Sequence, residues 1–476
     1  MRRYTKLGKN VALITIGNFA SKILSFFLIP LYTAVLTTEE FGIADLMTTT
    51  INLISPFFTL LISESIMRFA LEKDVDKSEV LGIGLITTIA GFVVMLLFSP
   101  LILFSRSLQP FYLLFIVYYF AVTLHSVVSQ FVKGVERVGI YSLAGVAQTI
   151  CFISLNLILL LVVKTGVNGY LIALIGSHIF ATIILWLGGR IHSFLPNKVA
   201  INRALFRDML KYSIPLIPNS LSWWVSNSAD KFILTFFCGL SVTGIYSVSQ
   251  RIPSIFSIIS TIFMSAWQIS AIEDFGSEES RKFFGKIYRS YSSLNILVVS
   301  VLICLTRIIA SFLFLKDFYQ GWEYVPILLV AYLFYAMAGF LGTIYTAAKQ
   351  TKMVFISTVI SALTNIVLNF IMIPIWGGIG AAIATLVSYF VVWFVRLIDS
   401  RKIIKLDIDL NRDIFAYFIL LIQVIFMMLD TGSGMLISLV LVVGICVLYR
   451  NELIQYISLI IKILKRVIGG KNQLFE

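Results

Sequence analysis

The sequence has few of the residues that build catalytic or metal sites in soluble proteins. Charged residues make up only 13% of its 476 positions, and it contains four cysteines and three histidines. The cysteines stand singly in apolar surroundings, without the paired spacing of a disulfide framework or a zinc site: Cys151, Cys238, Cys304 and Cys446. The histidines likewise form no ligand cluster: His125, His178 and His192. The sequence therefore predicts neither a metal site nor a cofactor.

Apolar residues, by contrast, make up 59% of the chain and gather in about fourteen long stretches. About 20 apolar residues carry a helix across ~30 Å of hydrocarbon, and the stretches lack the period of two that a membrane barrel needs. The sequence therefore predicts an all-α integral membrane protein with about fourteen transmembrane helices and no large soluble domain. The expected spans are residues 11–36, 41–66, 81–104, 111–132, 138–163, 167–187, 212–237, 241–272, 288–314, 324–347, 353–375, 378–398, 413–429 and 433–449.

The formal net charge of +13 raises the question of a nucleic-acid partner, and the positions of the basic residues answer it. Most of the 37 Lys and Arg fall on every second break between the spans, counted from the N-terminus. Cytoplasmic loops of membrane proteins carry such an excess of basic residues. Both termini are therefore predicted to face the cytoplasm, and no nucleic-acid partner is expected. The first apolar stretch is too long for a cleaved signal peptide and is expected to remain as a span.

Short motifs recur in the same order in the two halves of the chain. The matched pairs include Asn18 with Asn219, Gly42 with Gly244, Asn156 with Asn369, and Gly166 with Gly377. The members of each pair lie roughly 200 residues, or six spans, apart, so both copies enter the bilayer in the same direction. The sequence predicts two pseudosymmetric six-helix bundles as parallel repeats, an arrangement typical of transporters. Their bounds are residues 1–208 and 209–400, and residues 401–476 add a helix pair and a basic amphipathic tail.

Several of these segments resemble a known family. In the first half they are residues 17–22 (GNFASK), 30–33 (PLYT) and 39–46 (EEFGIADL), and in the second half residues 212–219 (YSIPLIPN) and 244–247 (GIYS). They resemble the polysaccharide-biosynthesis flippases of the multidrug, oligosaccharidyl-lipid and polysaccharide (MOP) exporter superfamily. The resemblance implies a multi-pass protein of the bacterial cytoplasmic membrane. It would move an undecaprenyl-diphosphate-linked oligosaccharide from the inner to the outer leaflet among membrane lipids, with Na⁺ or H⁺ as candidate coupling ions.

Basic residues inside the spans suit such a cargo, because a sugar diphosphate needs a polar path with positive charge through the hydrocarbon. Lys22 lies about eleven residues, or ~16 Å, from either end of the first span, too far to reach the interface comfortably. Arg251 lies some ten residues into span 241–272. Lys231 lies nearer the outer end of span 212–237. We interpret all three as substrate-binding cations of a central cavity. Buried ion pairs are the alternative, and for Lys231 so is a side chain that reaches the interface.

Other polar residues in or beside the spans are candidates for ion coupling or for support of the site. Asp45 falls in the first turns of its span, where the helix dipole stabilises a carboxylate. Glu64 and Arg68 have the i, i+4 spacing of a local salt bridge. These structural roles are the alternatives to coupling. The remaining candidates are Asp230 and the repeat-related Asn18 and Asn219.

Four prolines within spans or near their ends are candidate hinges for a rocking motion of the two halves: Pro30, Pro215, Pro218 and Pro253. Proline removes a backbone hydrogen bond and kinks or unwinds a helix. The pair at positions 215 and 218 is expected to unwind the inner part of span 212–237. Stationary kinks that only improve packing are the alternative.

Two other functions predict different residues. A multidrug or cation antiporter of the same superfamily predicts embedded acids, whereas the mid-span basic residues favour the flippase. A membrane-embedded glycosyltransferase, polymerase or ligase predicts positioned acids and a substantial outer loop, but all outer breaks are short. The acidic pair Glu39-Glu40 follows Thr37-Thr38 at a helix start, where capping explains it. The sequence therefore predicts a transporter rather than an enzyme.

Overall fold

The computed structural model describes residues 26–195, 202–273, 280–348, 352–429 and 433–456, together with Leu24, Phe275, Gln350 and Ser458. All regular secondary structure in these residues is helical, as predicted. Nine helical segments among them are long and apolar enough to cross a membrane, or up to eleven if each of two bent helix pairs is one span. The protein is therefore a multi-pass helical membrane protein. The count of fourteen spans stays a prediction.

The chain forms two compact units, each built from several segments. The first unit comprises Met1–Arg251, Phe312–Gly321 and Ala362–Ala384. The second comprises Ile252–Ser311, Trp322–Ser361 and Thr385–Glu476. The predicted division into residues 1–208, 209–400 and 401–476 stays a prediction.

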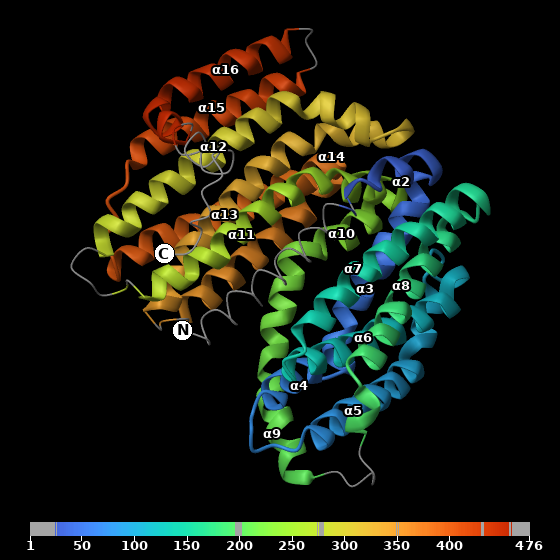
Figure 1. Ribbon diagram of the computed structural model, residues 1–476. Helices are drawn as coiled ribbons and strands as arrows, with labels where there is room; N and C mark the ends of the chain where they lie inside the picture. The colour runs from blue at the N-terminus through green and yellow to red at the C-terminus, as the bar shows by residue number, and fades with distance from the viewer. Residues whose placement is uncertain are drawn as a thin grey trace, which may run out of the picture. The chain divides into compact units, whose positions relative to one another are not determined.

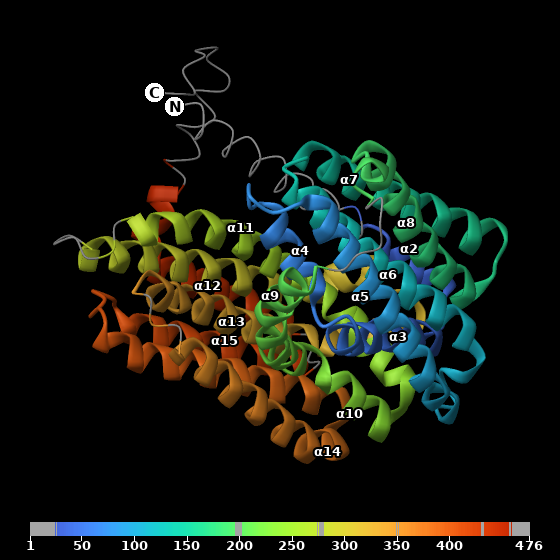
Figure 2. The same cartoon turned by 90° about the horizontal axis from the view of Figure 1, so that it is seen from below.

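The first unit is a helical bundle in which α6, α7 and α8 run side by side (Figures 1 and 2). One apolar core surrounds Phe115 and Tyr119, and a second surrounds Ile66 and Phe131. The α-helices are α2 (Ile29–Val35), α3 (Thr38–Phe58), α4 (Ile62–Ala70), α5 (Lys77–Phe98), α6 (Tyr112–Gly134), α7 (Val138–Asn156), α8 (Gly166–Gly188), α9 (Arg203–Ser213) and α10 (Ile217–Ser249). Shorter helical turns are η1 (Ser99–Phe104), η2 (Gln109–Phe111), η3 (Leu157–Val162), η4 (Ile191–Phe194) and η5 (Ile214–Leu216).

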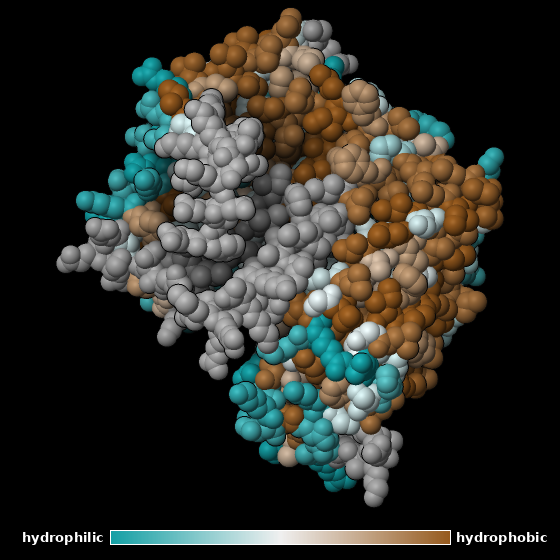
Figure 3. Space-filling model, viewed as in Figure 1, coloured by the Kyte–Doolittle hydropathy of each residue, from teal (hydrophilic) through white to brown (hydrophobic). Residues whose placement is uncertain are grey.

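The outer surface of this unit follows the expectation for a protein in lipid. Hydrophobic side chains cover the face over α7 and α8, whereas hydrophilic side chains gather at the end of the unit where α4 and α9 lie (Figure 3). Exposed apolar residues on these helices include Leu143, Ile150 and Leu187. Lipid rather than water can accommodate such a surface.

The helix predicted as one span over residues 41–66 is broken. Helices α3 and α4 meet at an angle of 64°, and Leu60 and Leu61 between them have φ angles of 54° and 50°. Side chains other than glycine are uncommon in this left-handed region. On the neighbouring α5, a Cβ at Gly91 would clash with the carbonyl oxygen of Phe58, so a glycine lets the broken helix pack closely there.

Two further breaks occur where they were predicted, at glycines with positive φ. Gly239 (φ 85°) interrupts α10 between the spans predicted at 212–237 and 241–272. Gly377 (φ 55°) interrupts α14 between those predicted at 353–375 and 378–398. Glycine adopts this backbone conformation without the clash that a Cβ causes. The 51-residue segment Lys352–Lys402, counted among the nine, is accordingly about twice the length that a single span needs.

The second unit is centred on α13 (Val325–Ala347), which is buried along nearly its whole length. Its other helices are α11 (Arg251–Glu273), α12 (Ser280–Leu313), α14 (Lys352–Asp399), α15 (Leu410–Met428) and α16 (Gly434–Leu448), with the turns η6 (Lys316–Glu323) and η7 (Ser400–Lys402). Parts of α12, η6 and α14 belong to the first unit by their contacts. Helices α15 and α16 lie side by side (Figure 1).

Buried polar side chains join α15 and α16 to α12. Gln423 of α15 accepts a hydrogen bond from the Ser300 hydroxyl of α12 at 3.0 Å and donates to the Ser438 hydroxyl of α16 at 2.8 Å. Nearer the other end of α15, Asp413 accepts from Ser292 at 2.9 Å and from Tyr449 at 2.7 Å. Because apolar side chains gain little by leaving lipid for a helix interface, such hydrogen bonds contribute to helix association in a membrane.

Replacing Gln423 by alanine should therefore lower stability. One residue supplies the links to both α12 and α16, so we expect a loss of about 1–2 kcal/mol. The thermal unfolding midpoint of the detergent-solubilised protein measures this change. Leu436→Ala is the control, because Leu436 on α16 is 67% exposed and should be near neutral. Equal midpoints for the two variants would contradict the proposed links.

Candidate functional site

Charged side chains meet inside the first unit, where α3 packs on α10. The Lys231 ammonium lies 2.7 Å from the Asp45 carboxylate, and the Arg251 guanidinium lies 3.7 Å from its other oxygen. Asp45 and Lys231 are only 10% and 12% exposed, whereas Arg251 is 44% exposed. Together with Asp230, Tyr246 and Ser247 these residues form what we call the Asp45 cluster. Two predicted cavity cations thus converge on one carboxylate.

The surroundings of Asp45 differ from the sequence-based interpretation. Asp45 is the eighth residue of α3, which begins at Thr38, whereas the effect of a helix dipole falls off within the first turn. Its carboxylate is held by the two cations and by a 2.8 Å hydrogen bond from the Ser247 hydroxyl. Stabilisation of Asp45 by the dipole at a helix start is therefore wrong. Ion pairs with residues about two hundred positions away in the sequence stabilise its carboxylate instead.

The second acid of the cluster is paired differently. Asp230 is buried and accepts a 2.8 Å hydrogen bond from the Tyr246 hydroxyl and a 2.9 Å bond from the Lys231 backbone N–H. Within the described part of the chain, its carboxylate lies within 4 Å of no cationic group. Around Asp45, therefore, two positive groups share one negative group.

Glycines bring the two helices of the cluster close together. A Cβ at Gly42 of α3 would clash with the Leu240 carbonyl, and a Cβ at Gly244 of α10 would clash with the Thr38 carbonyl. Small residues where two membrane helices cross let the helices approach closely. The Thr38 and Ser241 hydroxyls then hydrogen-bond at 2.6 Å across the same crossing. The close crossing brings Lys231 and Ser247 of α10 within reach of Asp45.

The other predicted polar residues lie apart from the cluster or outside the described residues. Lys22 and Asn18 lie outside them. Asn219 is exposed in the first turn of α10. Glu64 accepts a 3.3 Å hydrogen bond from Gln130, and Arg68 pairs at 3.1 Å with Glu72. The predicted Glu64–Arg68 salt bridge is therefore wrong, since Arg68 takes its i, i+4 partner from the opposite direction.

The four candidate hinge prolines stand at or before helix starts rather than in helix interiors. Pro30 is the second residue of α2, Pro218 is the second residue of α10, and Pro253 is the third residue of α11. Pro215 lies in the 3₁₀ turn η5 between α9 and α10. The proline pair thus coincides with an interruption of the α-helix by a 3₁₀ turn, where a kink or unwinding was predicted. A hinge motion at any of the four prolines stays a prediction.

Glu40, the second residue of the acidic pair at the start of α3, has the expected capping role. The Thr37 hydroxyl accepts from the Glu40 backbone N–H, and the Glu40 carboxylate accepts from the Thr37 N–H, so both halves of a capping box are present. Glu40 also accepts from the Val167 N–H at 3.3 Å, which ties the start of α3 to that of α8. Among the residues that the structure describes, no group of three or more His, Cys, Asp or Glu could hold a metal ion.

Comparison with known proteins shows the family to which the chain belongs and the fold that it shares. Residues 7–268, more than half of the chain, match the model of a family described as polysaccharide biosynthesis protein. An uncharacterized membrane protein of Methanocaldococcus jannaschii is 22% identical over 369 residues, which cover 70% of each chain. A structure of the lipid II flippase MurJ in an inward closed conformation is similar with a TM-score of 0.70 and 16% identity, over 93% of this chain and 100% of MurJ.

An inward-facing multidrug resistance transporter of the MATE family, within the MOP superfamily, is also similar. Its TM-score is 0.58 at 13% identity, over 81% of this chain and 97% of that one. At these identities the structural likeness establishes the fold. The two solved proteins share that fold although their cargoes differ, so the cargo has to be argued from the site itself.

Proposed function

Because the chain belongs to the polysaccharide biosynthesis protein family, we propose that it flips an undecaprenyl-diphosphate-linked oligosaccharide across the bacterial cytoplasmic membrane. The cargo would move from the inner to the outer leaflet by alternating access, with both termini in the cytoplasm. The likeness of the fold to that of a lipid II flippase supports a lipid-linked cargo. The proposal includes a central cationic cavity between two six-helix repeats.

The observation that carries the proposal is the pairing in the Asp45 cluster. Lys231 and Arg251 both lie within ion-pair distance of the Asp45 carboxylate, so two positive groups are gathered at one point inside the unit. A diphosphate group supplies the opposite charge, and Arg251, whose side chain is 44% exposed, is the cation best placed to meet it. The diphosphate would compete with Asp45 for the two cations, so cargo binding and cluster opening are coupled.

Pseudosymmetry within the first unit supports the two-repeat arrangement. Gly42 and Gly244 are the repeat-related pair, and each faces the residue four positions before the other: Leu240 and Thr38. The next repeat-related pair, Asp45 and Ser247, hydrogen-bonds across the same crossing. In this proposal α3 and α10 cross on the pseudo-twofold axis, and the halves rock about that crossing.

A second repeat-related pair points the same way. Gly166 has a φ of 57° and Gly377 a φ of 55°, so both copies of the motif have a glycine with positive φ at the same position. Gly166 begins α8, and Gly377 precedes the second part of α14. Similar φ angles at matched positions are expected of a duplicated unit.

The experiment is to delete the gene in its host and to measure lipid-linked oligosaccharide on the cytoplasmic leaflet. We expect it to accumulate, and the wild-type gene to clear it. Arg251→Gln should clear it poorly, because the exposed cation of the cluster is lost. Arg68→Gln is the matched control, because that arginine is 54% exposed, pairs with Glu72 and lies outside the cluster.

The proposal fails if no oligosaccharide accumulates in the deletion strain, or if Arg251→Gln clears it as well as the control does. A multidrug or cation antiporter is the second candidate, and the buried carboxylate of Asp230 favours it because such proteins need embedded acids. Altered drug export without oligosaccharide accumulation, lost in Asp230→Asn, would support that function instead.

A further inference from the structure

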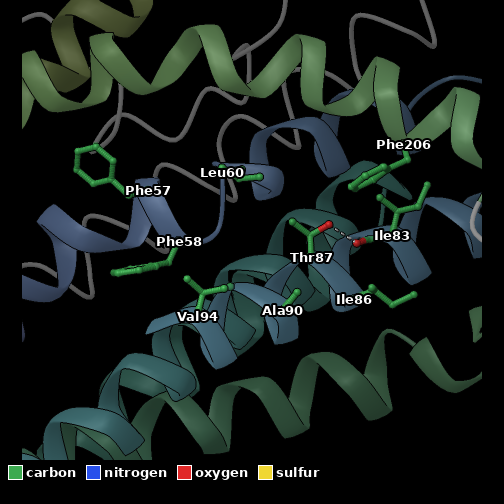
Figure 4. A pocket seen from close by; sticks show the side chains of 10 residues that line it. Phe57, Phe58, Leu60, Ile83, Ile86, Thr87, Ala90, Val94 and Phe206 are labelled. Carbon is green, nitrogen blue, oxygen red and sulfur yellow. Dashed lines mark hydrogen bonds between the residues drawn. The ribbon is translucent and has the colours of Figure 1, made fainter. Parts of the chain in front are cut away.

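A pocket away from the Asp45 cluster opens in the first unit between α3, α5 and α9 (Figure 4). Phe57 and Phe58 line it from α3, Ala90 and Val94 from α5, and Phe206 from α9. Its volume is about 320 Å³, at the lower end of the range for small-molecule sites. Phe57 and Val94 are 49% and 43% exposed, so the pocket opens to the surroundings of the bundle.

The lining of the pocket is chemically uniform. Its one polar side chain is Thr87, and the Thr87 hydroxyl donates a 2.8 Å hydrogen bond to the Ile83 carbonyl of its own helix (Figure 4). The pocket therefore offers no unsatisfied donor or acceptor from a side chain. A hydrocarbon chain satisfies such a lining, whereas a sugar or a diphosphate would lose its hydration without compensation.

The helix that contributes Phe206 is amphipathic and positively charged. Arg203, Arg207 and Lys211 recur at i, i+4 and i+8, so they share one face of α9, and all three are exposed. The single acid of α9 is Asp208. Phe206 lies between the buried face of α9 and this basic stripe. An apolar pocket thus adjoins a cationic surface.

Hydrogen bonds hold α9 in this position. The Ser65 hydroxyl of α4 donates to the Met209 carbonyl at 2.5 Å. The Asn202 amide donates to Glu79 of α5 at 3.0 Å and its oxygen caps the start of α9. Gly91 holds the α3 end of the pocket against α5. These contacts fix the position of the basic stripe of α9 relative to the pocket.

We propose that this pocket binds one acyl chain of an anionic phospholipid whose phosphate lies against the basic stripe of α9. The charge of the stripe selects an anionic head group, and the apolar lining accepts the chain attached to it. The site is distinct from the Asp45 cluster, so the proposal goes beyond transport of the lipid-linked cargo. It predicts a lipid held at one place rather than a general preference for an anionic membrane.

Photolabelling tests the site directly. The full-length protein is placed in phosphatidylcholine nanodiscs that contain phosphatidylglycerol with a photoreactive group on its acyl chain, and labelled peptides are mapped. We expect labels in residues 57–60 and 83–94. Ala90→Trp should fill the pocket and remove them. Leu97→Trp is the control, because Leu97 of α5 is 75% exposed and lies outside the lining.

The basic stripe of α9 is tested separately. Each Lys or Arg near an anionic surface contributes roughly 1 kcal/mol, so Arg207→Gln should weaken phosphatidylglycerol binding about fivefold. Lys73→Gln is the control, because Lys73 is exposed in the segment before α5. Equal labelling by the phosphatidylcholine probe, or equal labelling of the two tryptophan variants, would overturn the proposal. Competition by undecaprenyl phosphate but not by phosphatidylglycerol would overturn it too, and would assign the pocket to the carrier lipid.

Discussion

Gly244→Ala is expected to destabilise the protein severely. The new Cβ would clash with the Thr38 carbonyl, and it would also lie 3.0 Å from the Gly42 backbone nitrogen. Backbone atoms cannot rotate away as a side chain can, so α3 and α10 would have to separate. Overpacking of this kind costs on the order of 3 kcal/mol. The expected loss in the free energy of unfolding exceeds this value, because separation of the helices also stretches the Asp45–Lys231 ion pair.

A matched control isolates the clash from the general effect of alanine in a helix. A Cβ at Gly145 of α7 would meet nothing within 4 Å, so Gly145→Ala should be neutral or should stabilise by up to about 1 kcal/mol. Gly42→Ala should resemble Gly244→Ala, because its Cβ would clash with the Leu240 carbonyl. The midpoint of thermal unfolding in detergent compares the three variants. A Gly244→Ala protein as stable as Gly145→Ala would refute the close crossing.

Much of the helical layout can be predicted from local features of the sequence. Hydrophobic length and composition predict helical spans, and the gaps between the predicted spans fall at Gly239 and Gly377, where the structure has glycines with positive φ. Family motifs around residues 39–46 predicted the match to polysaccharide biosynthesis proteins. These features depend on neighbours in the sequence, so they can be predicted without knowing which helices meet.

Features set by tertiary packing escaped prediction. The bend between α3 and α4 lies at two leucines, and nothing in their residue type marks it. Arg396 belongs by sequence to a basic break. In the structure it is buried and donates to neutral groups, among them the Ser357 hydroxyl at 2.9 Å and the Ala338 carbonyl at 2.9 Å. Its partners come from other parts of the chain, so no local pattern reveals them.

Asp45 shows the same limit within the candidate site. Two of the three predicted cavity cations, Lys231 and Arg251, were singled out because charge inside an apolar span is costly. Their shared partner Asp45 is a candidate for ion coupling or site support by sequence, but a carboxylate near a helix start also has a local explanation, so the sequence does not link it to these two cations. Only the packing of α3 on α10 brings Asp45 within ion-pair distance of both cations, and no local pattern reveals that packing.

Asp45→Asn should be the most damaging single substitution within the cluster. Asparagine keeps the shape of the side chain and can still accept from Ser247, but it leaves Lys231 and Arg251 without the carboxylate that they share. Lys231 is 12% exposed, so water compensates it poorly. Removing one partner of such a buried pair costs about 3 kcal/mol or more. Lys231→Met should cost less, because Asp45 retains Arg251 and Ser247.

The double variant Asp45→Asn/Lys231→Met separates the ion pair from a general intolerance of change. Since the substitution at position 231 removes the buried charge that Asp45→Asn leaves unpaired, the double variant should unfold at a higher temperature than Asp45→Asn alone. Glu72→Gln, which breaks a largely exposed pair with Arg68, should lose less than about 1 kcal/mol. Thermal unfolding of the four proteins and the wild type completes the cycle. Additive losses at positions 45 and 231 would mean that the pair contributes no coupling, and the Asp45 cluster would then lose its role as the switch that cargo opens.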